Sequence, residues 1–157
     1  DVYEGGIQIP MIAYWKNKIK AGQTTDHISA QYDVMATCAE LLGVKPTYPT
    51  DGISFLPTLL NKNTQKQHEY LYIEYPENGG QLAIRKGDWK GVKRNVKANP
   101  ATTWEIYNLK DDLSERNNLA AAQPELTKEF DEIVKREHHP SHVREWEFVD
   151  PKFEVKK

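Results

Sequence analysis

The densest group of side chains that could do chemistry is a histidine cluster near the C-terminus. His138, His139 and His142 stand close together, and closely spaced imidazoles can hold a divalent metal ion. Adjacent histidines point in different directions in any regular element, and Pro140 prevents a helical pair four residues apart. No carboxylate at a suitable spacing completes a closed site. The pattern therefore favours a solvated tail over a metal site, and folding that is insensitive to chelators would exclude the metal.

Cys38 is the other obvious candidate, because a thiolate can act as a nucleophile. It stands among apolar residues at helical spacing, such as Val34 and Leu41, where a cysteine usually behaves as a small buried hydrophobe. We therefore expect Cys38 to be a core residue. As the only cysteine, it also excludes an internal disulfide and a Cys-rich zinc site.

Several aromatic side chains could stack on sugar rings, namely Tyr72, Tyr75, Trp89, Trp104 and Trp146. Aromatic residues are also good strand formers, so packing explains most of them. The sequence contains no nucleophile elbow, no phosphate-binding glycine-rich loop and no EF-hand loop. Taken by themselves, these residues do not form a self-contained active site.

Composition narrows the class of partner. Twenty-one Lys and Arg residues oppose 23 Asp and Glu residues, for a net charge of −2, so a nucleic-acid partner is not expected. The most basic stretch, 85–97, alternates with apolar residues and indicates the solvated side of strands. No apolar run approaches the ~20 residues that a membrane span needs. The sequence does not begin with Met, so residue 1 is not expected to be the native start.

The elements that must position these residues differ between the two halves of the chain. The apolar run 7–15 predicts a buried strand, and its partners are expected in a sheet outside this sequence. A helix is predicted over 29–42, ended by Gly43 as a left-handed C-cap, and Ser54 is expected to begin a short helix over 55–61.

The second half predicts a small antiparallel sheet. The four predicted strands are 70–75, 81–85, 89–96 and 104–109, separated by Gly- and Asp-containing turns. Pro124 begins a predicted helix whose buried stripe consists of Leu126, Phe130, Ile133 and Val134. The fold class is α+β: an antiparallel sheet of three to four strands, packed by a C-terminal helix.

Six short segments, in one order along the chain, resemble motifs of the arylsulfatase family. They are Tyr3–Pro10 (Tyr-Glu-Gly-Gly-x-Arg-x-Pro in the family, with Gln8 in place of Arg), Trp15–Ile19, Asp33–Thr37 (with Ala36 in place of Pro), Asp51–Pro57, Arg85–Lys90 and Tyr107–Ala120. They are spread over residues 3–120 and together resemble the C-terminal portion of a formylglycine-dependent sulfatase of the alkaline-phosphatase-like superfamily.

The resemblance implies an organisation and a function. Residues 1–66 would supply the last strand and helices of the large α/β domain, residues 67–137 the C-terminal subdomain, and residues 138–157 a polar tail. The parent would hydrolyse sulfate esters of a sulfated carbohydrate, with a calcium ion and a formylglycine nucleophile that lie upstream in the family. This portion would bind no cofactor and would be inactive alone. Its partners would be the N-terminal sulfatase domain and a sulfated small molecule or glycan. The parent would be periplasmic or secreted.

The resemblance carries no catalytic residue onto this sequence. It implies that Tyr3, Glu4, Gly5 and Gly6 form a turn that shapes the active site, just after a sulfate-binding lysine of the family. The contacts expected at the pocket rim are made by His68, Arg85 and Trp89.

Two other readings stay open. The chain could be a stand-alone carbohydrate-binding or interaction module that uses the sheet aromatics. It could also belong to a phosphoesterase of the same superfamily. A Cys-x-Pro-x-Arg motif in the sequence encoded before Asp1 would indicate the sulfatase.

Overall fold

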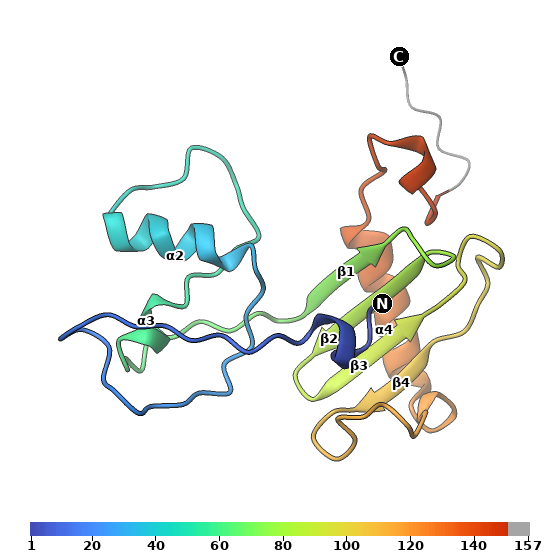
Figure 1. The fold of residues 1–157 in the computed structure, drawn as a ribbon. Coiled ribbons are helices and arrows are strands. Elements are labelled where there is room, and N and C mark those ends of the chain that lie inside the picture. The colour runs from blue at the N-terminus through green and yellow to red at the C-terminus, as the bar shows by residue number, and fades with distance from the viewer. Residues whose placement is uncertain (151–157) are drawn as a thin grey trace. The chain divides into compact units, whose positions relative to one another are not determined.

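A computed structural model describes residues 1–150. These residues separate into two compact units, one formed by Asp1–Ile9 with the chain from Tyr70 onward, and the other by Pro10–Glu69. The helices and strands of the two units are labelled in Figure 1.

The first unit is built on a four-stranded antiparallel sheet in the order β1-β2-β3-β4. Its strands are β1 Leu71–Tyr75, β2 Gln81–Lys86, β3 Trp89–Lys93 and β4 Glu105–Asn108. Each strand pairs with the next along the chain, as the turn spacing predicted. The expected small antiparallel sheet is therefore confirmed.

Helix α4, Pro124–Glu137, covers one face of the sheet. Its buried residues Phe130 and Ile133 join a core that includes Ile84 and Ile106, while Leu126 and Val134 pack against it, as the predicted stripe required. Gly91 of β3 permits this close approach, because a Cβ there would lie 2.4 Å from the Phe130 ring. The short 3-10 helix η1, Ala120–Ala122, leads into α4.

The N-terminal residues cover the opposite face of the sheet. Val2 is buried with Ala83 and Val92, and helix α1, Glu4–Ile7, follows (Figure 1). The strand expected over 7–15 does not form within the described chain. A strand needs a hydrogen-bonded neighbour, and no described strand pairs with this segment.

The second unit contains α2, Asp33–Leu42, and α3, Leu56–Leu59. Gly43 ends α2 with φ +67°, so the predicted C-cap is confirmed. We expected the apolar residues of α2, such as Val34 and Leu41, to be buried. Instead they are exposed, and the polar residues Asp33 and Thr37 are buried. The expectation that Cys38 is a core residue is wrong for the same reason: these apolar residues have nothing in the described chain to pack against.

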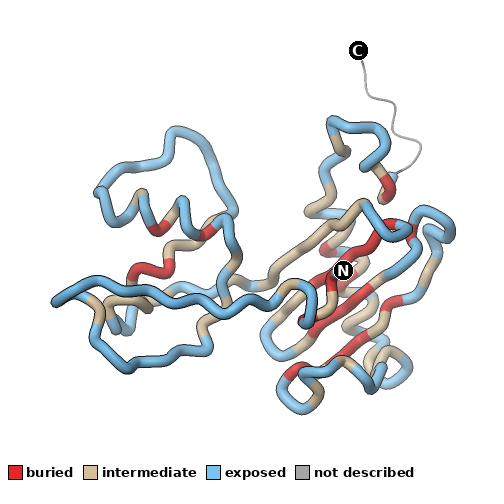
Figure 2. The backbone as a smooth tube through the Cα atoms, viewed as in Figure 1, coloured by how far each residue is buried: buried red, intermediate tan, exposed pale blue. Residues whose placement is uncertain are grey.

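The segment after α4 is more closely packed than the expected solvated tail. It contains the 3-10 turn η2, Arg144–Trp146, and then Phe148, which is 2% exposed and belongs to the core of the first unit. Figure 2 shows that most of this segment is exposed. The rest of the expected tail, 151–157, lies outside the described residues.

Candidate functional site

A buried cluster of four charges fixes the Tyr3–Gly6 turn to the sheet. Glu4 is 3% exposed, and its Oε1 lies 2.7 Å from Lys90 Nζ while its Oε2 accepts a hydrogen bond of 2.9 Å from Arg85. Lys90 is 0% exposed and also lies 3.1 Å from Glu115 Oε1. Glu115 Oε2 in turn accepts a hydrogen bond of 2.6 Å from the backbone N–H of Glu4.

The sheet register explains how the two cations come together. Arg85 of β2 and Lys90 of β3 are directly opposite each other, so their side chains leave the same face of the sheet. Two carboxylates and two cations balance in charge, which is the condition under which buried ions persist. The cluster therefore holds α1 on the sheet face remote from α4.

Tyr3 forms a second contact between the turn and the sheet. Its hydroxyl donates a 2.5 Å hydrogen bond to Glu105, which also accepts hydrogen bonds from Tyr107 (2.7 Å) and Arg94 (2.8 and 3.0 Å). Burial, followed by the hydrogen bond to Glu105, raises the pKa of Tyr3 to about 12. Burial alone would raise the pKa of Glu105, but its three hydrogen-bond donors hold it below the ordinary value.

The glycines of the turn have different roles. A Cβ on Gly6 would lie 2.4 Å from the backbone oxygen of Asp1, so only glycine fits there. A Cβ on Gly5 would meet nothing within 4 Å. Gly5 borders an open hollow of about 620 Å³ between the turn and the loop that contains Leu113, Ser114 and Glu115.

The structure brings Arg85 to the turn but assigns Trp89 to the other face. Arg85 NH1 is held by Glu4, and its Nε has no hydrogen-bond partner among the described residues. Trp89 is partly buried against the core that α4 covers. Alternation along β3 explains the difference, because Trp89 and Lys90 are neighbours and must point to opposite faces.

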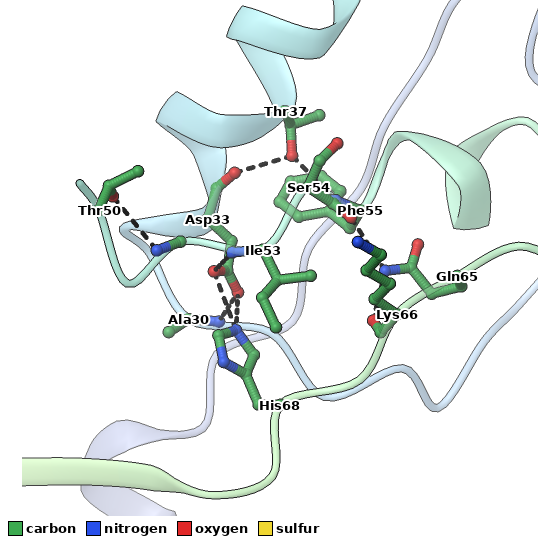
Figure 3. Close-up of polar contacts among 11 residues, drawn as sticks. Ala30, Asp33, Thr37, Thr50, Ile53, Ser54, Phe55, Gln65, Lys66 and His68 are labelled. Carbon is green, nitrogen blue, oxygen red and sulfur yellow. Dashed lines mark hydrogen bonds and ion pairs between the residues drawn. The ribbon is translucent and has the colours of Figure 1, made fainter. Parts of the chain in front are cut away.

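His68, the third residue expected at a pocket rim, lies in the second unit. Its Nε2 is 2.9 Å from both carboxylate oxygens of Asp33, which also accept the backbone N–H groups of Ala30 (2.7 Å) and Ile53 (2.8 Å) (Figure 3). Asp33 is 0% exposed and the His68 side chain 9% exposed. In this unit, Asp33 joins the start of α2 to two later segments, and His68 completes that contact.

In the second unit, another set of polar contacts joins α2 to α3. Thr37 Oγ1 donates a 2.8 Å hydrogen bond to the Asp33 carbonyl and accepts one of 3.0 Å from the N–H of Phe55 (Figure 3). Gln65 adds hydrogen bonds to Thr58 and to the Ser54 carbonyl. These polar contacts explain why the polar side of α2 is the buried one.

The sequence did not indicate the central role of Lys90 or Glu115. Lys90 belongs to the basic stretch interpreted as solvated, and that interpretation is wrong for this residue. A strand covered on both faces has no solvated side. The one available signal was that Lys90 lies opposite Arg85 across the turn predicted between the strands 81–85 and 89–96.

The described residues do not fit a metal centre. No group of three or more His, Cys, Asp or Glu side chains within residues 1–150 is arranged to hold a metal ion. In the histidine cluster, His138 contacts Glu74 and Glu147, whereas His139 and His142 are exposed. None of the helices formed by residues 1–150 has the length and apolar character of a membrane span.

Comparison with known proteins identifies the family. The sequence profile of the family described as N-sulphoglucosamine sulphohydrolase, C-terminal, matches residues 1–149. An N-acetylgalactosamine-6-O-sulfatase of Bacteroides thetaiotaomicron is 31% identical over 148 residues, covering 85% of this chain and 28% of that protein. Arylsulfatase A of Bos taurus is 29% identical over 154 residues, covering 85% of this chain and 30% of that protein.

A solved structure shows the same fold. It is a protein in complex with its substrate D-glucosamine-2-N,6-O-disulfate, with a TM-score of 0.58 and 30% identity over 75% of this chain and 26% of that one. The chain thus spans less than a third of the relatives it matches. The sheet and its helices correspond to the C-terminal part of the alkaline-phosphatase-like sulfatase fold. The chain belongs to the family described as N-sulphoglucosamine sulphohydrolase, C-terminal.

Proposed function

We propose that this chain supports the active site of a formylglycine-dependent sulfatase by holding the Tyr3–Gly6 turn at the edge of the sulfate site. The nucleophile and the calcium ligands would come from the sulfatase domain that precedes this portion in the family. The observation that carries the proposal is the buried cluster around Glu4. It connects the turn to two strands of the sheet through Arg85 and Lys90.

The chemical consequence is preorganisation. Stabilisation of charge on a reacting sulfate requires groups fixed within a fraction of an ångström. A turn held by buried ion pairs and by the Tyr3–Glu105 hydrogen bond has few alternative positions. The sheet would therefore act on the reaction through the position of the turn, without touching the sulfate itself.

Exposed apolar surface in the second unit supports the need for further protein. Ile12 is 95% exposed and Met35 of α2 is 69% exposed. Other large apolar side chains of this unit are also exposed, namely Met11, Tyr14, Trp15, Val34, Leu41 and Leu42. Soluble proteins rarely leave so many together in water, so these residues are proposed to pack against the large sulfatase domain.

The proposed substrate is a sulfated carbohydrate that contains a hexosamine. The names of two relatives, an N-acetylgalactosamine-6-O-sulfatase and an N-acetylglucosamine-6-O-sulfatase, are those of enzymes acting on sulfated amino sugars. Among the three proposed rim residues, Arg85 has a side chain that is 21% exposed and can therefore be reached by a ligand. His68 and Trp89 are engaged in the second unit's polar network and in the core, so Arg85 is the stronger candidate.

The experiment compares the natural polypeptide, with the sequence encoded before Asp1, and residues 1–157 alone. Both are assayed on 4-methylumbelliferyl sulfate and on 6-O-sulfated N-acetylhexosamines, and formylglycine is sought by mass spectrometry. We expect turnover by the longer polypeptide only. In that polypeptide, Glu4→Gln should lower kcat more than it changes KM, whereas the exposed control Glu125→Gln should change neither. Turnover by residues 1–157, or an unaffected Glu4→Gln enzyme, would refute the proposal.

The same experiment addresses the phosphoesterase alternative. An upstream Thr or Ser nucleophile, without a Cys-x-Pro-x-Arg motif and with hydrolysis of phosphate esters, would favour that reading.

A second candidate function, glycan binding by the chain alone, is favoured by one observation. Among the candidate stacking residues, Trp104 is 3% exposed, but Trp146 is 57% exposed and available to a sugar ring. Binding of a sulfated oligosaccharide by residues 1–157, abolished by Trp146→Ala, would support this function. Equal binding of the oligosaccharide by the unmodified chain and by the Trp146→Ala variant would exclude Trp146 as the stacking residue.

A further inference from the structure

Residues 139–150, here called the C-terminal strap, are attached to the first unit by a buried phenylalanine. Phe148 is 2% exposed and belongs to the core cluster. Its ring lies against Gly80 of the β1–β2 loop, where a Cβ would be 2.7 Å from Phe148 Cδ2. Lys97 Nζ adds a hydrogen bond of 3.2 Å to the Glu145 carbonyl.

A single carboxylate organises the strap internally. Glu147 Oε1 accepts the backbone N–H groups of Val149 (2.9 Å) and Asp150 (2.8 Å), and its Oε2 accepts that of Ser141 (3.0 Å). Its side chain is 4% exposed. Burial alone would raise the pKa of Glu147, but these N–H donors and nearby His138 hold it below the ordinary value. The strap therefore folds around an ionised carboxylate.

His138 stands between the strap and the sheet. It follows the last residue of α4, and its Nδ1 lies 2.9 Å from Glu74 Oε1 of β1. On the other side of the ring, Nε2 lies 3.4 Å from Glu147 Oε1, and it is buried without a hydrogen-bond partner among the described residues. The side chain is 12% exposed, so water has little access to it.

The charges around this ring are mostly negative. Tyr72 of β1 donates a 2.6 Å hydrogen bond to Glu74, and the carboxylates of Glu74, Glu137 and Glu147 all raise the pKa of Tyr72, although burial is the larger cause. Arg136 of α4 is engaged with Glu137 and with the hydroxyl of Tyr70. This corner thus has three carboxylates and one permanent cation.

A protonated imidazole fits that environment and a neutral one does not. The imidazolium has an N–H group on each ring nitrogen. Nδ1 can therefore donate to Glu74 while the Nε2–H group faces the Glu147 carboxylate. A neutral ring has one donor, and its other nitrogen presents a lone pair. If Nδ1 keeps its proton for Glu74, that lone pair faces the Glu147 carboxylate.

We propose that His138 is a proton-operated latch for the C-terminal strap. With the proton bound, His138 bridges Glu74 of β1 and Glu147 of the strap, and Phe148 stays in the core. Loss of that proton to solvent turns the Nε2 contact from attraction to repulsion, and the strap opens more often. Because histidine changes charge between about pH 5 and pH 8, the latch responds within that range.

The test is amide hydrogen exchange on the 157-residue chain, at about pH 5.5 and about pH 8, corrected for intrinsic rates. The reporters are the N–H groups of Ser141, Val149 and Asp150, and the internal references are those of Ile84 and Ile106 in the sheet. We expect protection of the three strap amides to fall by about tenfold at the higher pH, which corresponds to the loss of about 1.4 kcal/mol of ion-pair attraction. The sheet amides should change much less.

Two matched variants separate the latch from a general effect of pH. His138→Gln keeps an N–H donor toward Glu74 but cannot titrate, so strap protection should lose its pH dependence. His142→Gln removes an exposed histidine of the same strap and should behave as the unmodified chain does. A flat profile in the unmodified chain, or the same slope in His138→Gln, would overturn the proposal.

Discussion

Lys90 and Glu4 are 86 residues apart in the sequence, yet Lys90 Nζ lies 2.7 Å from Glu4 Oε1 in a buried ion pair. Neither side chain is more than 3% exposed. The pair connects the first turn of the chain to the middle of a sheet strand. It therefore links the segment proposed to shape the sulfate site to the sheet of the first unit.

Removing the buried cation should strongly destabilise the first unit. Lys90→Met leaves Glu4 and Glu115 with Arg85 as the remaining cation of the cluster, so one buried carboxylate loses its partner. We expect a loss of about 3–5 kcal/mol in the free energy of unfolding, measured by urea denaturation followed through Trp fluorescence. Lys86→Met is the control, because its Glu129 partner is 39% exposed and the pair should contribute less than about 1 kcal/mol. Equal losses in the two variants would contradict this account.

A methyl group at Gly91 should disturb the packing of α4 on the sheet. The added Cβ would lie 2.4 Å from Phe130 Cδ2, and a core ring has little space to move. Gly91→Ala should cost about 1–3 kcal/mol, seen as a lower Tm by calorimetry. Gly5→Ala should stay within about 0.5 kcal/mol, since nothing lies near its Cβ. If the overlap between the added methyl group and the Phe130 ring causes this loss, Phe130→Leu should lower the stability less in the Gly91→Ala variant than in the unmodified chain.

Neutralising Asp33 should loosen the second unit without affecting the sheet. Asp33→Asn keeps the size of the side chain but replaces one acceptor oxygen with a donor, beside the N–H groups of Ala30 and Ile53. The expected loss is about 1.5–3 kcal/mol, the range for a hydrogen bond to a charged group. Exchange at the Ile53 amide should speed up, while exchange at Ile84 in the sheet should not. Exposed Asp26→Asn serves as the control, and unchanged Ile53 exchange would show that Asp33 is not the joining group.

The Tyr3–Glu105 pair should make the first unit sensitive to both pH extremes. Because the pKa of Tyr3 is about 12 in the fold and about 10 when unfolded, its stabilisation is complete below pH 10 and is lost as pH rises towards 12. Glu105 has a lowered pKa, so its contribution is present above its unfolded pKa of about 4.3 and is lost as pH falls through the folded value.

Ultraviolet titration of tyrosinate checks this prediction. The spectrum that Tyr3→Phe removes identifies the Tyr3 signal. In Glu105→Gln, Tyr3 should ionise at a lower pH, although still above its ordinary value, because burial is the larger cause of its raised pKa. An unshifted Tyr3 midpoint would mean that Glu105 does not influence it.

The local elements of the first unit could be predicted because their signals are local. Turn residues separated the strands, and Pro124 with a periodic apolar stripe marked α4. Ordered motifs also identified the family, because each depends on identities and spacing that folding does not alter. The same reasoning failed for 7–15 and for α2, whose apolar residues indicate burial but do not say which partner provides it.

The sequence by itself therefore determined the four strands of the sheet, the presence of helices α2, α3 and α4, and the sulfatase relationship. Only the tertiary structure decided that Lys90 is buried between Glu4 and Glu115, that His68 pairs with Asp33, and that Phe148 returns to the core. The physical reason is that a charged residue can be buried only where the fold supplies opposite charges and hydrogen-bond partners. Those partners lie 25 to 86 residues away along the chain, beyond the range of any local pattern.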